Sequence, residues 1–116
     1  MNRLIATLVL FILAVQISFA QSIEPVFERQ NNLVKATYFY DNGAIKEVGY
    51  FKNDKLHSQW ISYNEEGKVK VTARYKNGKK HGKWYFVGDD TVKEVNYKSN
   101  KIIKVKDVEE LDTSLI

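Results

Sequence analysis

One ten-residue stretch occurs twice in the sequence, first as Phe51-Lys52-Asn53-Asp54-Lys55-Leu56-His57-Ser58-Gln59-Trp60 and again as Tyr75-Lys76-Asn77-Gly78-Lys79-Lys80-His81-Gly82-Lys83-Trp84. An aromatic residue, Lys, Asn, Lys, His and Trp recur at the same places in both copies, with a period of 24. The same spacing separates Gly43 from Gly67. A period of this size is typical of an array of stacked supersecondary units. The repeat therefore predicts a series of similar units, each packed against the next.

Each repeat is expected to fold into two antiparallel strands joined by a turn. Residues 68–75 alternate strictly between polar and apolar side chains, which indicates a half-buried strand. Residues 60–63 and 84–87 are short runs rich in aromatic and β-branched side chains, which strands favour. Asn77-Gly78 supplies the positive φ angles of a tight hairpin turn. The sequence thus predicts an all-β protein, an antiparallel meander of stacked β-hairpins forming a single curved sheet of roughly six strands.

A third repeat is degenerate. Residues 92–97 (Val-Lys-Glu-Val-Asn-Tyr) echo residues 45–50 (Ile-Lys-Glu-Val-Gly-Tyr), and residues 98–101 echo the Lys-Asn-Gly-Lys turn. The loop at residues 88–90 differs in length from its counterparts, and no Gly-x-Trp follows the last turn. Decay of the pattern at the end of an array is typical of a capping repeat.

The repeats resemble MORN repeats, in the variant found in the YwqK family. Their pattern is approximately aromatic-x-x-x-Gly, a variable strand, Tyr-Lys-Asn-Gly-Lys and then x-Gly-x-Trp. The best match here runs from Tyr63-Asn64-Glu65-Glu66-Gly67 through Tyr75-Lys76-Asn77-Gly78-Lys79 to Gly82-Lys83-Trp84. The preceding repeat departs from the pattern, because Asp54 replaces the turn glycine and Ser58 replaces the glycine before the tryptophan.

This resemblance covers residues 36–101, and it implies a fold more specifically than a role. Proteins of the YwqK family are often labelled as antitoxins of toxin–antitoxin systems. Other MORN proteins have been assigned lipid-binding, dimerising or scaffolding roles.

Residues 1–20 have the order of a signal peptide. Met1-Asn2-Arg3 carries a positive charge, residues 4–17 are almost wholly apolar, and Ser18-Phe19-Ala20 places small residues at −3 and −1 of a cleavage site. We expect cleavage after Ala20 and export to the periplasm or the extracellular space. The alternative, an uncleaved anchor, is disfavoured because the apolar stretch is shorter than the roughly 20 residues that a spanning helix needs.

The rest of the chain divides into three parts. Residues 21–32 are expected to be an N-terminal lead-in, because Pro25 and the adjacent Asn31 and Asn32 argue against regular structure. Residues 33–106 form the predicted repeat domain, and residues 107–116 form a C-terminal tail.

Composition excludes several classes of function. The 116 residues contain no cysteine, which removes disulfides, thiolate nucleophiles, Fe–S clusters and Cys-type zinc sites. The formal charge of +4 is mild for a nucleic-acid binder, and no nucleic-acid partner is expected. The sequence has no nucleophile elbow and no phosphate-binding glycine loop, so we expect neither catalysis, nor a cofactor, nor a small-molecule substrate.

The two histidines, His57 and His81, occupy equivalent places in successive repeats. Equivalent positions in neighbouring hairpins should lie roughly 9–10 Å apart, which is too far for one zinc ion without further ligands. No metal site is therefore expected, and each histidine should pack or form a hydrogen bond near the turn ahead of its tryptophan.

Aromatic and basic residues of the repeats are the candidate partner-binding residues. They are Trp60, Tyr63, Tyr75, Trp84, Tyr85, Lys76, Lys79, Lys80 and Lys83. The tryptophans are expected to stack along one face of the sheet as its core, with some rings left exposed as a platform. The lysines at the turns either keep a wet rim free of aggregation or form a strip for an acidic protein or anionic lipid.

The leading hypothesis is an exported, non-catalytic β-repeat module that binds another protein, in one version as an antitoxin or immunity protein. The alternative is a structural protein that associates with itself or binds the envelope surface.

Overall fold

The computed structural model describes residues 22–112 and 114. The predicted signal peptide, with its cleavage site after Ala20, lies outside the described residues. The strands are β1 (Val26–Gln30), β2 (Leu33–Phe39), β3 (Ile45–Lys52), β4 (Lys55–Tyr63), β5 (Val69–Lys76), β6 (Lys79–Lys80), β7 (Gly82–Val87), β8 (Val92–Lys98) and β9 (Lys101–Val108). The described part of the chain has no helix long and apolar enough to cross a membrane.

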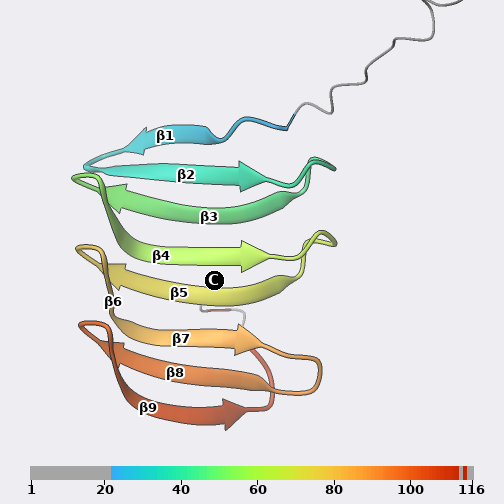
Figure 1. Ribbon diagram of the computed structural model, residues 1–116, viewed down its shortest axis with the longest axis vertical. Helices are drawn as coiled ribbons and strands as arrows, with labels where there is room; N and C mark the ends of the chain where they lie inside the picture. The colour runs from blue at the N-terminus through green and yellow to red at the C-terminus, as the bar shows by residue number, and fades with distance from the viewer. Residues whose placement is uncertain (1–21, 113, 115–116) are drawn as a thin grey trace, which may run out of the picture.

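The strands form one antiparallel meander, as predicted (Figure 1). Sequence neighbours pair throughout in the order β1-β2-β3-β4-β5-β7-β8-β9, and the two-residue strand β6 pairs with β5 beside β7. Within the part of the chain that the structure describes, the first and last strands of this path, β1 and β9, are each paired on one side only, so the sheet is open.

The period of the sequence is also the period of the structure. The bounds of β5 are those of β3 displaced by one repeat, and β6 with β7 occupies the place that β4 holds in the preceding repeat. The third repeat is slightly shorter than the others. The turn between β8 and β9 comes less than 24 residues after the equivalent turn between β5 and β6. The hairpin array and its degenerate last unit are therefore confirmed.

Turns with positive φ angles fix the hairpins on one side of the array. Asn77 and Gly78 have φ angles of 49° and 81°, as the Asn-Gly pair predicts. Asn53 and Asp54 adopt the same left-handed conformation, at 49° and 63°, although neither is glycine. Successive turns are tied together, since Gly78 N donates a hydrogen bond of 2.7 Å to the carbonyl oxygen of Leu56 in the preceding repeat.

Two predicted boundaries are wrong. The lead-in at residues 21–32 contains β1, because Asn31, with a φ angle of 57°, makes a tight turn instead of a break and returns the chain along β2. At the other end β9 extends to Val108, so the tail begins after that residue and not at residue 107. The sheet also has more strands than the roughly six expected, β1 and the short β6 among them.

Candidate binding face

Directly opposed residues in successive strands lie on the same face of a sheet. One row of such residues crosses the whole sheet, and its large and small side chains are mixed. The row consists of Phe27, Ala36, Gly49, Trp60, Ala73, Trp84, Val95 and Val105. Its step from Ala73 to Trp84 continues the β5–β7 pairing by one residue beyond Thr72 and Tyr85. Trp60 lies over Gly49, where no side chain intervenes. The small residues therefore leave room for the two indole rings.

Eight aromatic rings lie in two contacting groups on the face that carries this row, which we call the aromatic face. They are Phe27, Tyr38, Phe51 and Trp60 in the first group, and Tyr75, Trp84, Phe86 and Tyr97 in the second. The contact is repeated with the sequence: Phe51 meets Trp60 edge-on at 5.8 Å between ring centroids, and Tyr75 meets Trp84 edge-on at 5.1 Å. Such edge-to-face pairs stabilise beyond the area they bury.

The rings are buried to different degrees along the face. Trp84 is 6% exposed and forms the core with Ala73, Val95 and Tyr97, and its Nε1 donates a hydrogen bond of 2.8 Å to the carbonyl oxygen of Arg74. Trp60 packs against this core but is only half-buried. The two tryptophans lie on one face, as predicted, but they do not stack on each other: each belongs to a separate ring group, and only Trp84 is buried in the core.

No second layer of described residues covers the aromatic face, because all the strands belong to one sheet. Phe27 is 59% exposed and Phe86 is 36% exposed. A groove of ≈ 410 Å³ lies near the β1 edge of the sheet. Its apolar lining includes Phe27, Val34 and Phe51, and its charged lining residues are Arg29 and Asp54. A face of this kind offers apolar area with a few charged groups at its border, as interaction surfaces do.

Lys80 is the basic residue most closely associated with the rings. Its Nζ lies 5.0 Å from the centroid of the Trp84 ring and 5.1 Å from that of Tyr97. A lysine at this distance from two rings is held by cation–π attraction. Burial, with smaller contributions from Glu47 and Tyr97, raises the pKa of Tyr75, so this phenol keeps its proton on the aromatic face at neutral pH.

Tyr85 does not belong to the aromatic face. It follows Trp84 in β7 and points to the opposite side of the sheet, where it opposes Thr72 and Glu94. Its hydroxyl donates a hydrogen bond of 2.7 Å to Glu94 Oε1, and both residues are buried. Burial and the bond to the Glu94 carboxylate raise the pKa of Tyr85 to about 12, while the same bond is the main reason that the pKa of Glu94 is lowered.

Glu94 gathers two lysines on this opposite face. Lys106 Nζ lies 3.4 Å from Glu94 Oε2, and Lys83 Nζ lies 3.9 Å from Glu94 Oε1. The candidate binding residue Lys83 therefore belongs to a structural cluster and is separated from Trp84. The cluster was missed from the sequence, although the alternation of residues 83–85 and 92–95 places Tyr85 and Glu94 on the same side of neighbouring strands.

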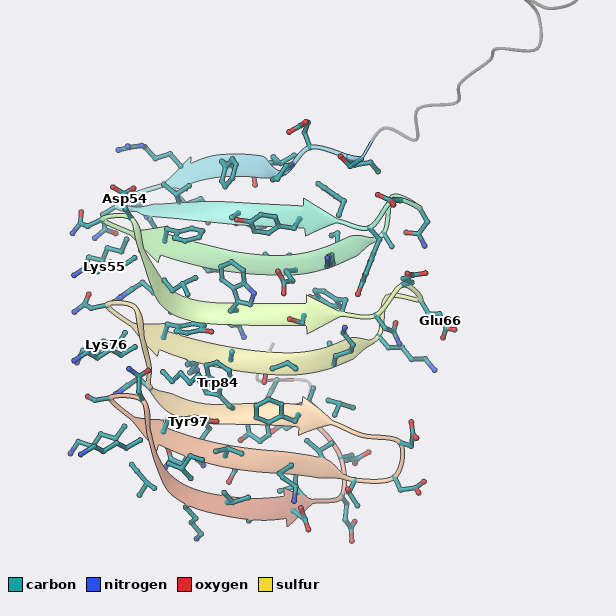
Figure 2. The ribbon with its side chains drawn as sticks, in the orientation of Figure 1. Asp54, Lys55, Glu66, Lys76, Trp84 and Tyr97 are labelled. Carbon is teal, nitrogen blue, oxygen red and sulfur yellow. The ribbon has the colours of Figure 1, made fainter. Side chains whose placement is uncertain are left out.

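The remaining lysines follow the turns. Lys76 and Lys79 flank the turn after β5, and Figure 2 shows Lys55 and Lys76 at the same margin of the sheet, with Glu66 at the other. We call these margins the basic rim (Lys52, Lys55, Lys76, Lys79, Lys98, Lys101) and the acidic rim (Asp41, Glu65, Glu66, Asp89, Asp90). Tyr63 lies at the acidic-rim end of β4, where its carbonyl oxygen accepts a hydrogen bond of 2.6 Å from the Tyr40 hydroxyl.

His57 has a structural role near its turn, as expected. Its Nδ1 accepts a hydrogen bond of 3.3 Å from the backbone N–H of Asn77 in the next repeat. Among the described residues no group of three or more His, Cys, Asp or Glu side chains is placed to hold a metal ion.

The candidate site is thus a ring-lined face with Trp60, Tyr75, Trp84 and Lys80 at its centre. The other candidate residues lie at the rims or on the opposite face. Comparison of the chain with protein-family models, with curated proteins and with solved structures found no match.

Proposed function

We propose that the protein is an exported, non-catalytic binding module of the MORN type whose aromatic face binds another protein. One observation supports this most directly: a face with eight contacting rings has no second layer over it among the described residues. Sheets bury such a face against another element, and this chain offers none in the described part. The groove beside Val34 would receive an apolar side chain of the partner, with Arg29 and Asp54 at its border.

The resemblance to the YwqK family supports a narrower version of this proposal. In it the module covers the active surface of a toxin, as an antitoxin or a periplasmic immunity protein. Absence of a toxin gene beside this one, together with the absence of a toxin among the captured proteins, would remove that version and leave the general one.

A pair of adjacent substitutions in β7 tests the aromatic face. Phe86 and Val87 are each 36% exposed and point to opposite faces, so Phe86→Ser and Val87→Ser remove similar exposed apolar side chains from the two sides. The processed chain is used as bait in an envelope extract of its own host. We expect one protein to be captured by wild type and Val87→Ser, and at least about five-fold less of it by Phe86→Ser, because a few aromatic side chains supply most of the binding energy of an interface.

Equal capture by the two variants, or no specific capture at all, would contradict binding through the aromatic face. The thermal unfolding of both variants is measured in parallel, so that a loss of fold is recognised as such.

The second candidate function is self-association, including a structural role at the envelope surface. Two observations favour it: the described strands leave the sheet open at both edges, and the lysines of the basic rim suit an anionic surface. Anionic lipid binding predicts sedimentation with vesicles containing anionic lipid, and loss of that sedimentation when Lys76→Glu and Lys79→Glu are combined.

A further inference from the structure

Among the described residues, both outermost strands leave one side of their backbone unpaired and expose apolar side chains. In β1 Phe27 is 59% exposed, and in β9 Ile103 is 59% and Val105 49% exposed. An edge strand of this kind is a template for pairing with another strand. The strand that would fit must match its direction, its register and its charges.

The direction of the strands allows a second copy to continue the sheet. The path from β1 to β9 contains eight strands, and every neighbouring pair is antiparallel. Because eight is even, β1 and β9 run in opposite directions. A second copy placed beyond β9 in the same orientation therefore presents its own β1 antiparallel to β9.

The row of opposed residues defines the register. Continuing it beyond Val105 places that residue opposite Phe27 of the second copy, with both side chains on the aromatic face. Opposed residues in an antiparallel sheet alternate between hydrogen-bonded and non-hydrogen-bonded pairs. Along the row, the two kinds of pair alternate from one pair of strands to the next. Because the path has an even number of strands, the pair of Val105 with Phe27 of the second copy continues this alternation. The unpaired N–H and C=O groups of β9 therefore face those of β1 in the second copy.

Charges on the face opposite the aromatic face also favour pairing of β9 with β1 of a second copy. In this register Lys104 of β9 lies opposite Glu28 of the second copy, and both are exposed. Pairing of β9 with a second β9 around Val105 would instead place Lys104 opposite Lys106 twice, and like charges in opposed positions are destabilising. Pairing of β1 with a second β1 would close a dimer and leave β9 unpaired.

We propose that β9 of one molecule pairs with β1 of a second copy, so that the meander continues from molecule to molecule as an open head-to-tail filament. This inference develops the second candidate function and does not depend on binding through the aromatic face. A contact that repeats without closing produces filaments and not rings of fixed size. Since β1 is short, the contact is small and the extent of assembly depends on concentration.

Charge reversal on the two edges gives a specific test. The chain is expressed with its own residues 1–20, its N-terminus is established by mass spectrometry, and its size is followed by sedimentation velocity up to high concentration at low ionic strength. Wild type should form species larger than a dimer. Lys104→Glu alone and Glu28→Lys alone should each raise the dissociation constant roughly three- to ten-fold, because each places like charges across every contact.

Mixing the two variants supplies the discriminating result. In an equimolar mixture, contacts between the two different variants again join opposite charges. Where β9 of the Lys104→Glu variant meets β1 of the Glu28→Lys variant, the two substituted residues pair with their charges exchanged. Where the order is reversed, the native Lys104 pairs with the native Glu28. The mixture should therefore assemble like wild type. Lys70→Glu in β5 and Glu66→Lys on the acidic rim make the same changes of charge away from both edges, and they should assemble unchanged.

Three outcomes would overturn the proposal. They are a monomer at all concentrations, an assembly that stops at a dimer, and assembly by the mixture that is as weak as that of either variant alone. None of these outcomes bears on capture of a partner by the aromatic face, because Phe86 and Val87 lie in β7, away from both edges.

Discussion

Gly49 lies directly beneath the indole ring of Trp60, and a Cβ atom at this position would overlap the ring. Gly49→Ala should therefore lower the free energy of unfolding by about 1–3 kcal/mol, the usual cost of forcing an extra group into a packed site. Urea denaturation followed by tryptophan fluorescence measures the change. In a Trp60→Leu background the same substitution should cost less, since a leucine can move aside; an equal cost would show that the ring is not the cause.

Ser58 is held at a φ angle of 64°, a conformation that suits glycine, and the equivalent residue of the next repeat is Gly82 at 85°. Ser58→Gly should raise the free energy of unfolding by about 0.5–1 kcal/mol, because it relieves a left-handed conformation that is costly for a residue with a Cβ. Gly82→Ser should lower it by a similar amount. Chemical denaturation of both variants checks the pair, and a loss of stability in Ser58→Gly would contradict this account.

Several individual residues could be predicted from the sequence. Asn77 and Gly78 form the tight turn that their types require, and Trp60 and Trp84 occupy equivalent ring contacts because they occupy equivalent places in the repeat. The positive φ angle of Ser58 was not predicted, because only its place in the repeat, and not its residue type, indicates that conformation.

At the scale of the strand, Tyr85 and Glu94 tie β7 to β8 by a buried hydrogen bond. Tyr85→Phe keeps the ring but removes the hydroxyl that donates a hydrogen bond to the Glu94 carboxylate. It should lower the free energy of unfolding by about 1–3 kcal/mol, the cost of an unsatisfied buried polar group. Tyr50→Phe, which removes a hydroxyl on the same face outside this cluster, should change it by less than about 0.5 kcal/mol. If thermal or urea unfolding showed that Tyr85→Phe and Tyr50→Phe lose similar amounts of stability, the hydrogen bond between Tyr85 and Glu94 would have no special role.

The same pair predicts how stability depends on alkaline pH. The pKa of Tyr85 is about 12 in the folded protein against an ordinary value of 10.0. Below pH 10 the phenol is protonated in both the folded and the unfolded protein, and its full contribution to the free energy of unfolding is present. Between pH 10 and 12 the unfolded chain ionises while the folded protein keeps the proton, so the contribution falls as pH rises. The difference in stability between wild type and Tyr85→Phe should shrink across this window; a constant difference would contradict the assignment.

Two elements show why the faces and ends of the sheet could not be predicted fully. The pairing of β4 with β5 is irregular between Ser62 and Tyr63, which are consecutive but oppose Val71 and Val69, two residues apart. Alternation counted along the sequence therefore does not assign the face of Tyr63. Strand β1 has no run of β-branched residues; it is a strand because the Asn31 turn places it beside β2. Tyr85 was assigned to the aromatic site by its residue type, whereas simple alternation with its neighbour in β7 would have separated the two.

At the scale of the whole molecule, protection from hydrogen exchange is expected to be highest in the strands of the buried cluster and lowest in the edge strand β1. One cluster of buried core residues lies in β5, β7 and β8, whereas every residue of β1 is exposed. Local opening costs least where few apolar contacts hold a segment. Hydrogen–deuterium exchange at low concentration should therefore show fast exchange in β1 and slow exchange in β5 and β8. Uniform protection across the sheet would indicate that the array opens only as a single unit.

Charge is also organised at this scale, because the meander sends alternate turns to opposite margins. The Lys-Asn-x-Lys turns recur on one rim and the acidic turns on the other, about 10 Å apart along each rim. This arrangement follows from the period of the sequence and needs no contact between distant residues.

The matching bounds of β3 and β5 have a consequence for how such a chain changes length over evolutionary time. Duplication of one whole repeat in the gene would add two strands at once, which preserves the orientation of everything downstream and supplies each new ring with its neighbours. Loss of one repeat would be equally smooth. Growth and shortening by whole modules are therefore accessible in single genetic events, whereas an insertion of one strand's length would turn the remainder of the protein around.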